Sequence, residues 1–193
     1  MQYLYLDSSN GLTLGLLNQS LEWVHLEFLD EKKPSEIVHV KINEIINNHQ
    51  LNLKNLKIIS SAGPGSYTGM RLSEGIARIL KVCGLETISF FQFEIPKLAG
   101  IKNGAWITNA FKGEIFIFEW DEISEQKKLM NSEKINKYTG FYSNLSEVSG
   151  VQAINTNVLL KNNSKEIFKE IIKRNAFFEA YYYRTIEEEF KPL

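Results

Sequence analysis

Residues 61–71 read SAGPGSYTGMR and join a short apolar run, LKIIS at 56–60, to an amphipathic run that ends at Gly84. This order predicts a buried strand, a glycine-rich turn and a helix. A glycine loop in that position often holds a phosphate group, because the N-terminus of the following helix attracts anions. The stretch is therefore either a phosphate site or a tight turn with another purpose.

The residues after the last glycine do not fit a nucleotide loop. A P-loop carries Lys and then Ser or Thr there, to hold phosphate and magnesium, whereas this chain has Met70 and Arg71. The three glycines are also spaced one residue too widely for the dinucleotide-binding fingerprint. A tight turn is the alternative, in which Pro64 fixes φ and the glycines take positive φ. These residues leave both alternatives open.

The composition is that of an ordinary globular protein. The 193 residues are 44% hydrophobic and 23% charged, enough for one large domain or two small ones. The 22 Lys and Arg residues nearly balance the 23 Asp and Glu residues, so strong nucleic-acid binding by this chain alone is not expected. A single cysteine, Cys83, excludes a disulfide framework, and no apolar run approaches the length of a membrane span. We expect a cytoplasmic protein without membrane contact.

The first hundred residues alternate in a way that predicts a mixed sheet. The runs at 2–9 and 11–18 are separated by Asn10-Gly11, a strong hairpin signal, and a third alternating run follows at 21–30. Apolar residues then recur at helical spacing over 35–49 and 69–83, with Thr68 as a candidate cap of the second helix. The expected stripe of that helix is Leu72, Ile76, Ile79, Leu80 and Cys83. With strands at 56–62 and 85–90 the order becomes β-β-β-α-β-α-β, and the later strands are expected to pair in parallel.

The second half begins with strands again. GAWITNA at 104–110 and EIFIFEW at 114–120 predict a hairpin, and 163–174 predicts an amphipathic helix. The aromatic tail from Phe177 is expected to dock on the rest of the chain. We therefore expect two lobes, residues 1–100 and residues 101–193.

No set of residues forms a convincing catalytic constellation. Asp7 ends the first strand before two serines, where it could hold a metal or a phosphate-bound water, or could satisfy turn amides. The histidines, His25, His39 and His49, are not spaced as a metal pair on one helix. Cys83 lies on the expected apolar stripe, which favours a core thiol over a nucleophile.

Both helices carry apolar or small residues on a second face. Ile37 and Val40 lie roughly opposite the core stripe of the first helix. In the second, Gly69, Ser73 and Ala77 recur every fourth residue beside Met70, so another helix could approach closely there. This face is covered either by the rest of the chain or by a partner, and the pattern alone does not decide between them.

The stretch GPGSYTGMR at 63–71 resembles the G-P-G-S-[FY]-T-G-x-R signature of the TsaB (YeaZ) family. Residues 3–19 and 35–46 are similar to that family's opening strand and hairpin and its first helix. NAFKGEIFIFEW at 109–120 resembles its D-A-R-x-G-E-V-Y segment, with Asn109 in place of Asp and Lys112 in place of Arg. YYYR at 181–184 resembles a C-terminal Tyr-Leu-Arg. The resemblance is strong over residues 1–120.

The resemblance implies an α/β, actin-like (ribonuclease-H-like) fold of two lobes with mixed sheets, the second lobe being reduced. TsaB-like proteins are non-catalytic partners of TsaD, which transfers threonylcarbamoyl to the adenosine beside the anticodon of ANN-decoding tRNAs. TsaE, an ATPase, joins the same assembly. The first two helices pack against TsaD, and isolated TsaB can self-associate through similar surfaces. The implied protein is a pseudo-enzyme subunit without cofactor or metal, and it meets tRNA only through the complex.

Two sets of residues follow from this resemblance. The expected partner-binding residues are Ile37, Val40, Lys41, Glu44, Gly69, Met70, Ser73, Glu74, Ala77 and Lys81. The signature loop comprises Gly63, Pro64, Gly65, Ser66, Tyr67, Thr68, Gly69 and Arg71. The competing hypothesis is a small actin-fold ATPase or kinase that uses Asp7 and the loop from Gly63 to Gly69.

Overall fold

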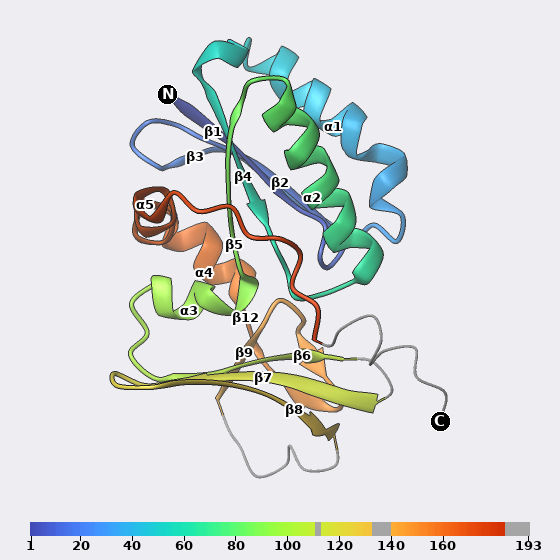
Figure 1. The fold of residues 1–193 in the computed structure, drawn as a ribbon, viewed down its shortest axis with the longest axis vertical. Coiled ribbons are helices and arrows are strands. Elements are labelled where there is room, and N and C mark those ends of the chain that lie inside the picture. The colour runs from blue at the N-terminus through green and yellow to red at the C-terminus, as the bar shows by residue number, and fades with distance from the viewer. Residues whose placement is uncertain (111–112, 133–139, 184–193) are drawn as a thin grey trace.

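The computed structural model describes residues 1–110, 113–132 and 140–183, which form two five-stranded sheets, one above the other in Figure 1. The first sheet contains β1 (Gln2–Asp7), β2 (Leu12–Leu17), β3 (Trp23–Leu29), β4 (Leu56–Ser61) and β5 (Glu86–Phe90). Its strand order is β3-β2-β1-β4-β5. The first three strands pair antiparallel, whereas β1, β4 and β5 pair in parallel. The predicted β-β-β-α-β-α-β order is confirmed.

The hairpin between β1 and β2 follows from the sequence. Gly11 takes a positive φ of +70° in the turn, a conformation that side chains rarely adopt. The β3 strand lies at the edge of the sheet, and two apolar residues of its alternating run, Val24 and Phe28, are exposed.

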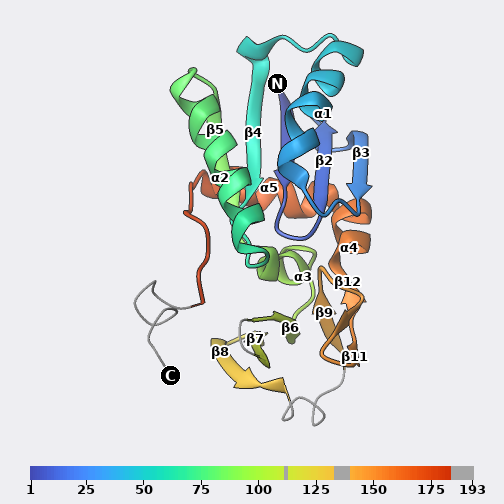
Figure 2. The same cartoon turned by 90° about the vertical axis from the view of Figure 1, so that its right-hand side faces the viewer.

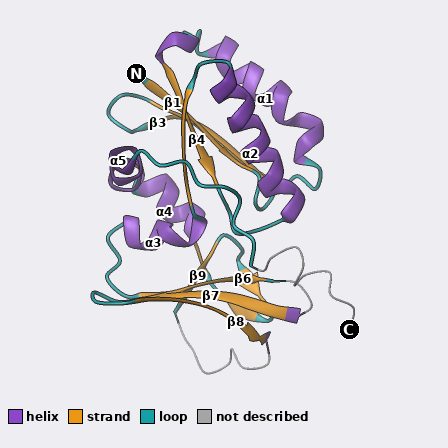
Figure 3. Cartoon of the chain, in the orientation of Figure 1, coloured by secondary structure: helices purple, strands orange, loops and turns teal. Residues whose placement is uncertain are grey.

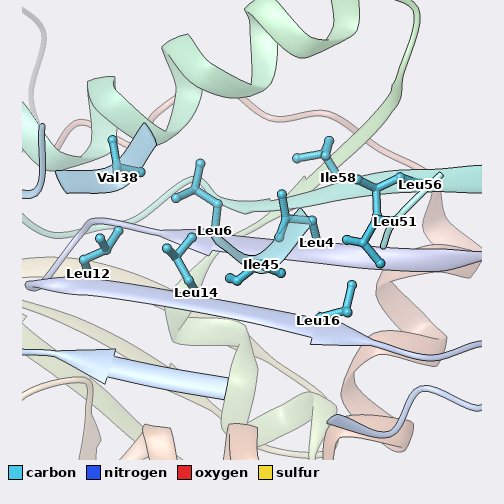
Figure 4. Packing of buried hydrophobic residues seen from close by; sticks show 10 residues of the cluster. All are labelled: Leu4, Leu6, Leu12, Leu14, Leu16, Val38, Ile45, Leu51, Leu56 and Ile58. Atoms are coloured by element: carbon cyan, nitrogen blue, oxygen red, sulfur yellow. The ribbon is translucent and has the colours of Figure 1, made fainter. Parts of the chain in front are cut away.

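Helices α1 (Pro34–Asn48) and α2 (Tyr67–Val82) cover one face of this sheet, as Figure 2 shows. Alternate strand residues, such as Leu4, Leu6 and Ile58, point toward them, because successive side chains of a strand point to opposite faces. Figure 4 shows these residues packed with Val38 and Ile45 of α1.

The opposite face of the first sheet is covered by helices from the other end of the chain. These are α4 (Thr156–Asn162) and α5 (Ser164–Arg174). The short helix α3 (Ile95–Leu98), which follows β5 in the chain, lies on the same face. Ile167, Phe168 and Ile171 are buried against Tyr5, as the amphipathic pattern predicted. The expected second lobe, residues 101–193, includes α4 and α5, yet these two helices pack on the first sheet. Short 3-10 turns, η1 (Leu53–Asn55) and η2 (Gln92–Glu94), precede β4 and α3.

The second sheet has the order β12-β9-β6-β7-β8. Its strands are β6 (Gly104–Asn109), β7 (Glu114–Trp120), β8 (Glu125–Asn131), β9 (Phe141–Ser143) and β12 (Ile154–Asn155), and β10 (Glu147–Val148) with β11 (Val151–Gln152) forms a separate hairpin. The predicted hairpin of β6 and β7 is present. Figure 3 shows that the lower sheet has few helices around it, whereas helices cover both faces of the upper one. The predicted class, a mixed α/β protein with two sheets, is confirmed.

Candidate functional site

The signature loop between β4 and α2 is packed against the turn that follows β1. A Cβ atom added at Gly69 would lie 1.8 Å from the Ser8 carbonyl oxygen, and one at Gly65 would lie 2.4 Å from the Ser9 carbonyl oxygen. Gly63 has a φ of +82° and lies against the Met70 side chain. These three glycines are therefore needed for close approach within the chain.

Hydrogen bonds join the loop to the Ser8–Ser9 turn. Ser66 N–H donates to the Ser9 carbonyl oxygen at 2.7 Å, and Ser8 N–H donates to Ser73 Oγ at 2.9 Å. The Ser8 hydroxyl donates to the Gly69 carbonyl oxygen at 2.6 Å. A phosphate loop offers backbone N–H groups to a ligand, whereas here the Ser66 N–H is taken by the chain's own Ser9 carbonyl oxygen.

The cap of α2 differs from the predicted one. Ser66 is the N-cap, and its Oγ accepts a hydrogen bond from Gly69 N–H at 3.3 Å, so the assignment to Thr68 was wrong. Thr68 is exposed on the first turn. Serine and threonine are both good caps, and the sequence alone could not place the first turn to within two residues.

Asp7 is buried and already has partners within the chain. Its carboxylate accepts hydrogen bonds from Ser9 N–H at 2.8 Å and from Gln92 Nε2. Burial raises the pKa of Asp7 above its usual value, although hydrogen bonds with Ser9, Ser61 and Tyr5 oppose the shift. The Asp7 carboxylate thus belongs to an internal polar cluster with Tyr5 and Ser61.

A cavity of about 500 Å³ lies beside this turn, between the two lobes. It is lined by residues 8–11 and 30–35, by the loop and start of α2, and by Thr108, Asn109, Asn144 and Leu145 of the second lobe. Asn10 Nδ2 donates to the Asn144 carbonyl oxygen at 3.0 Å and so joins the two lobes at this point. Asp7 is not part of the lining, and the charges of residues 30–33, two acids and two lysines, cancel.

The row of small residues on α2 faces inward. Gly69, Met70, Ser73 and Ala77 are all buried, and Ala77 is 0% exposed. The expectation that they form a partner surface was therefore wrong: small side chains bring α2 close to β1 and β4, where Ser73 bonds to Ser8. The helix is rotated so that two residues of the predicted apolar stripe, Ile79 and Cys83, are exposed.

Of the two apolar residues expected on the outer face of α1, one is exposed. Val40 is exposed, but Ile37 is half-buried against the core of the first sheet, so its assignment to the outer face was wrong. Lys41 Nζ lies 3.0 Å from Glu44 Oε2 and 3.6 Å from Glu27 Oε2. The hydrogen bond to Glu44, followed by the charge of Glu27, raises the pKa of Lys41.

We use the name α1–α2 surface for five exposed or half-buried apolar residues of the two helices: Val40, Leu72, Ile76, Ile79 and Val82. Ile79 is 64% exposed and Val82 is 88% exposed, while Leu72 and Ile76 are half-buried. Exposed apolar side chains grouped on one side of a protein are typical of interaction sites. Sequence reasoning missed Ile79 and Val82, because periodicity placed Ile79 in the core. Glu74 and Lys81, also expected at the interface, contact the C-terminal segment.

No helix in residues 1–110, 113–132 and 140–183 is long and apolar enough to cross a membrane. The same residues contain no group of three or more His, Cys, Asp and Glu side chains that could hold a metal ion. Asn109, which stands where the TsaB signature segment has Asp, accepts a hydrogen bond from the Ser149 hydroxyl. Lys112 and Arg184 lie outside the described residues.

These features define a two-lobed mixed α/β protein whose glycine loop is closed by its own chain and whose first two helices expose apolar residues. The first two of the following solved structures agree on the fold. YeaZ from Pseudomonas aeruginosa has a TM-score of 0.68 and 14% sequence identity, with 94% of this chain and 99% of that chain covered. A Pseudomonas aeruginosa protein described as similar to peptidase YeaZ gives the same score and identity over 95% and 99%. The ethanolamine utilization protein EutJ from Carboxydothermus hydrogenoformans has a TM-score of 0.47 and 11% identity, over 87% and 90%.

The likeness to YeaZ establishes the fold of this chain, and the expected actin-like architecture is confirmed. The two chains match over nearly their whole lengths, which gives no support to the expected shortening of the second lobe. No protein-family model and no curated protein matches the sequence.

Proposed function

We propose that this chain is a TsaB-type subunit, a non-catalytic protein that binds and activates TsaD. In this role it serves the formation of the threonylcarbamoyl group on the adenosine beside the anticodon of ANN-decoding tRNAs, together with TsaE. The proposal is supported by the signature at 63–71 and by the YeaZ fold over nearly the whole chain. The observation that carries the proposal is that the glycine loop is packed against the chain's own turn, while the α1–α2 surface exposes apolar side chains to solvent.

The α1–α2 surface is suited to a protein partner. Ile79 and Val82 would each leave water on docking, and burial of apolar area contributes roughly 25 cal/mol per Å² before the costs of association. The same two helices also carry charged residues that are exposed or half-buried, including Lys41 and Glu44 on α1 and Arg78 and Lys81 on α2. A second copy of the chain would compete with TsaD for the same residues, so a homodimer is expected only without TsaD.

The test measures binding of TsaD from the same organism by calorimetry. Ile79→Glu places a charge on the proposed contact, and we expect the dissociation constant to rise at least about tenfold, or 1.4 kcal/mol. Ile123→Glu is the matched control, because Ile123 is 97% exposed in the turn between β7 and β8. Both variants change an exposed isoleucine, so neither should unfold. Equal affinities for the two variants would remove the α1–α2 surface from the interface.

The competing hypothesis, an ATPase or kinase, is less well supported. Asp7 has its hydrogen bonds to Ser9 and Gln92, and the Ser8–Ser9 turn occupies the glycine loop. Calorimetry with ATP and magnesium on the isolated chain separates the two hypotheses. Tight binding that Asp7→Asn abolishes would favour the enzyme and count against the proposed subunit.

A further inference from the structure

The segment from Asn175 to Tyr183, which we call the strap, follows α5 and runs from the first lobe to the second (Figure 1). Its backbone is bonded to the first sheet at two places. Ser89 N–H donates to the Ala176 carbonyl oxygen at 2.8 Å, and Tyr181 N–H donates to the Ala62 carbonyl oxygen at 2.8 Å. The strap is therefore held in an extended course beside β5.

Backbone and side-chain groups of the strap also contact α2 along its length. Ala180 N–H donates to Glu74 Oε2 at 3.1 Å, and Arg78 donates to Glu179 Oε1 at 2.8 Å. The Phe177 ring lies 5.5 Å from the Arg78 guanidinium carbon and 5.2 Å from Lys81 Nζ. One residue in each turn of α2 thus meets the strap.

The first turn of α2 holds the strap through two residues of the signature. The Arg71 guanidinium lies 4.0 Å from the centre of the Tyr67 ring and 5.9 Å from that of Tyr182. Arg71 Nε donates to Tyr182 Oη at 3.2 Å, and Arg71 also donates to Tyr67 Oη. The Tyr67 and Tyr182 rings are 5.0 Å apart. Tyr67, Arg71 and Tyr182 form what we call the clasp.

The far end of the strap reaches the second lobe. Tyr181 and Tyr183 lie 5.4 Å and 5.2 Å from the ring of Phe116 on β7. Tyr181 also lies 5.5 Å from Phe93, which precedes α3. The strap consequently connects β5, α2 and the second sheet.

We propose that the strap fixes the position of α2 and thereby prepares the α1–α2 surface for its partner, with Tyr67 and Arg71 acting as positioning residues that hold Tyr182. This inference rests on the proposed function. A surface already held in its bound arrangement loses less conformational freedom on association, so it binds more tightly. Each clasp contact is exposed and individually weak, so the strap can open locally while the domain stays folded.

The experiment measures hydrogen exchange and TsaD binding on the same proteins. In Tyr182→Ala we expect the amides of Ala180 and Tyr181, and those of α2, to exchange about threefold to tenfold faster. We expect the affinity for TsaD to fall by about the same factor. The double variant with Arg71→Ala and Tyr182→Ala should bind TsaD no more weakly than either single variant, because both substitutions remove the same contact between Arg71 and Tyr182. Tyr182→Phe, which keeps the ring, should retain most of the affinity. Val158→Ala, an exposed residue on α4, is the remote control and should leave both readouts unchanged.

The outcomes separate the strap from the proposed function. Unchanged exchange at α2 in Tyr182→Ala would overturn the positioning role of the clasp. Faster exchange at α2 with unchanged TsaD affinity would overturn the link to the partner surface and leave the proposed function standing. If the wild-type chain binds no TsaD, the proposed function fails, and the exchange at α2 still decides whether the clasp holds that helix.

Discussion

Replacing Gly69 by alanine tests whether the signature glycines serve close packing within the chain. In a helix interior, Gly→Ala ordinarily stabilises by up to about 1 kcal/mol, because alanine has the higher helix propensity. At Gly69 the added Cβ would lie 1.8 Å from the Ser8 carbonyl oxygen. That oxygen belongs to the backbone and cannot move aside by a rotamer change, so it must retreat to at least 3.0 Å.

The retreat affects hydrogen bonds that are buried. Ser8 N–H would move away from Ser73 Oγ, which it now approaches to 2.9 Å. The Ser8 hydroxyl would likewise move away from the Gly69 carbonyl oxygen, which lies 2.6 Å from it. Overpacking of this kind costs roughly 1–3 kcal/mol, which exceeds the gain in helix propensity. We expect Gly69→Ala to lower the free energy of unfolding by about 2 kcal/mol and the Tm by about 4–8 °C.

Gly75 supplies the matched control on the same helix. A Cβ added there meets nothing within 4 Å, so Gly75→Ala should raise the Tm by about 2–4 °C. Thermal and urea unfolding of both variants, followed by circular dichroism, give the comparison. If Gly69→Ala proved as stable as Gly75→Ala, the close approach of the loop to the Ser8–Ser9 turn would not be the reason for its glycines.

Two further predictions concern the buried parts of the first lobe. Burial raises the pKa of Asp7 above its ordinary value of 3.8, so the folded protein binds this proton more tightly than the unfolded chain does. Asp7 therefore makes the free energy of unfolding fall as pH rises from 3.8 through the raised pKa, and Asp7→Asn should remove that part of the fall. The measurement is the urea midpoint of both proteins as a function of pH. Parallel pH profiles for the two proteins would contradict this prediction. Phe168→Ala should cost about 3–5 kcal/mol, because the ring is fully buried 5.3 Å from Trp23 and 5.7 Å from Tyr5. Lys169→Ala, at the exposed neighbouring residue, should change the free energy of unfolding by less than about 0.5 kcal/mol in the same urea assay. Similar losses of stability in Phe168→Ala and Lys169→Ala would mean that α5 is not docked on the first sheet.

The strands of the first lobe could be predicted because their signals are local, whereas β8 and β9 of the second lobe were not predicted. Asn10-Gly11 requires a turn, and the alternation on either side of it places leucines on one face, where they are buried. The same holds for the hairpin of β6 and β7. The α5 helix was also predicted correctly, since Ile167, Phe168 and Ile171 make an unambiguous apolar face.

The orientation of α2 could not be predicted in the same way. Hydrophobic periodicity weighs Leu72, Ile76 and Ile79 heavily and gives almost no weight to Gly69 and Ser73. The helix nevertheless buries the small residues, because they allow close approach to β1 and form hydrogen bonds with its end. The candidate interface consequently moved from Ala77 to Ile79.

The sequence by itself determined the order of strands and helices in the first lobe, the hairpins, and a glycine loop without the lysine of a phosphate site. Only the tertiary structure decided what that loop packs against, which face of α2 meets solvent, and where α5 and the strap return to. The physical reason is range: turn and periodicity signals act between neighbours in the chain. Gly69 and Ser8, which are in contact, are 61 positions apart in the sequence, and Arg71 and Tyr182 are 111 positions apart. Such contacts exist only once the sheet has brought those segments together.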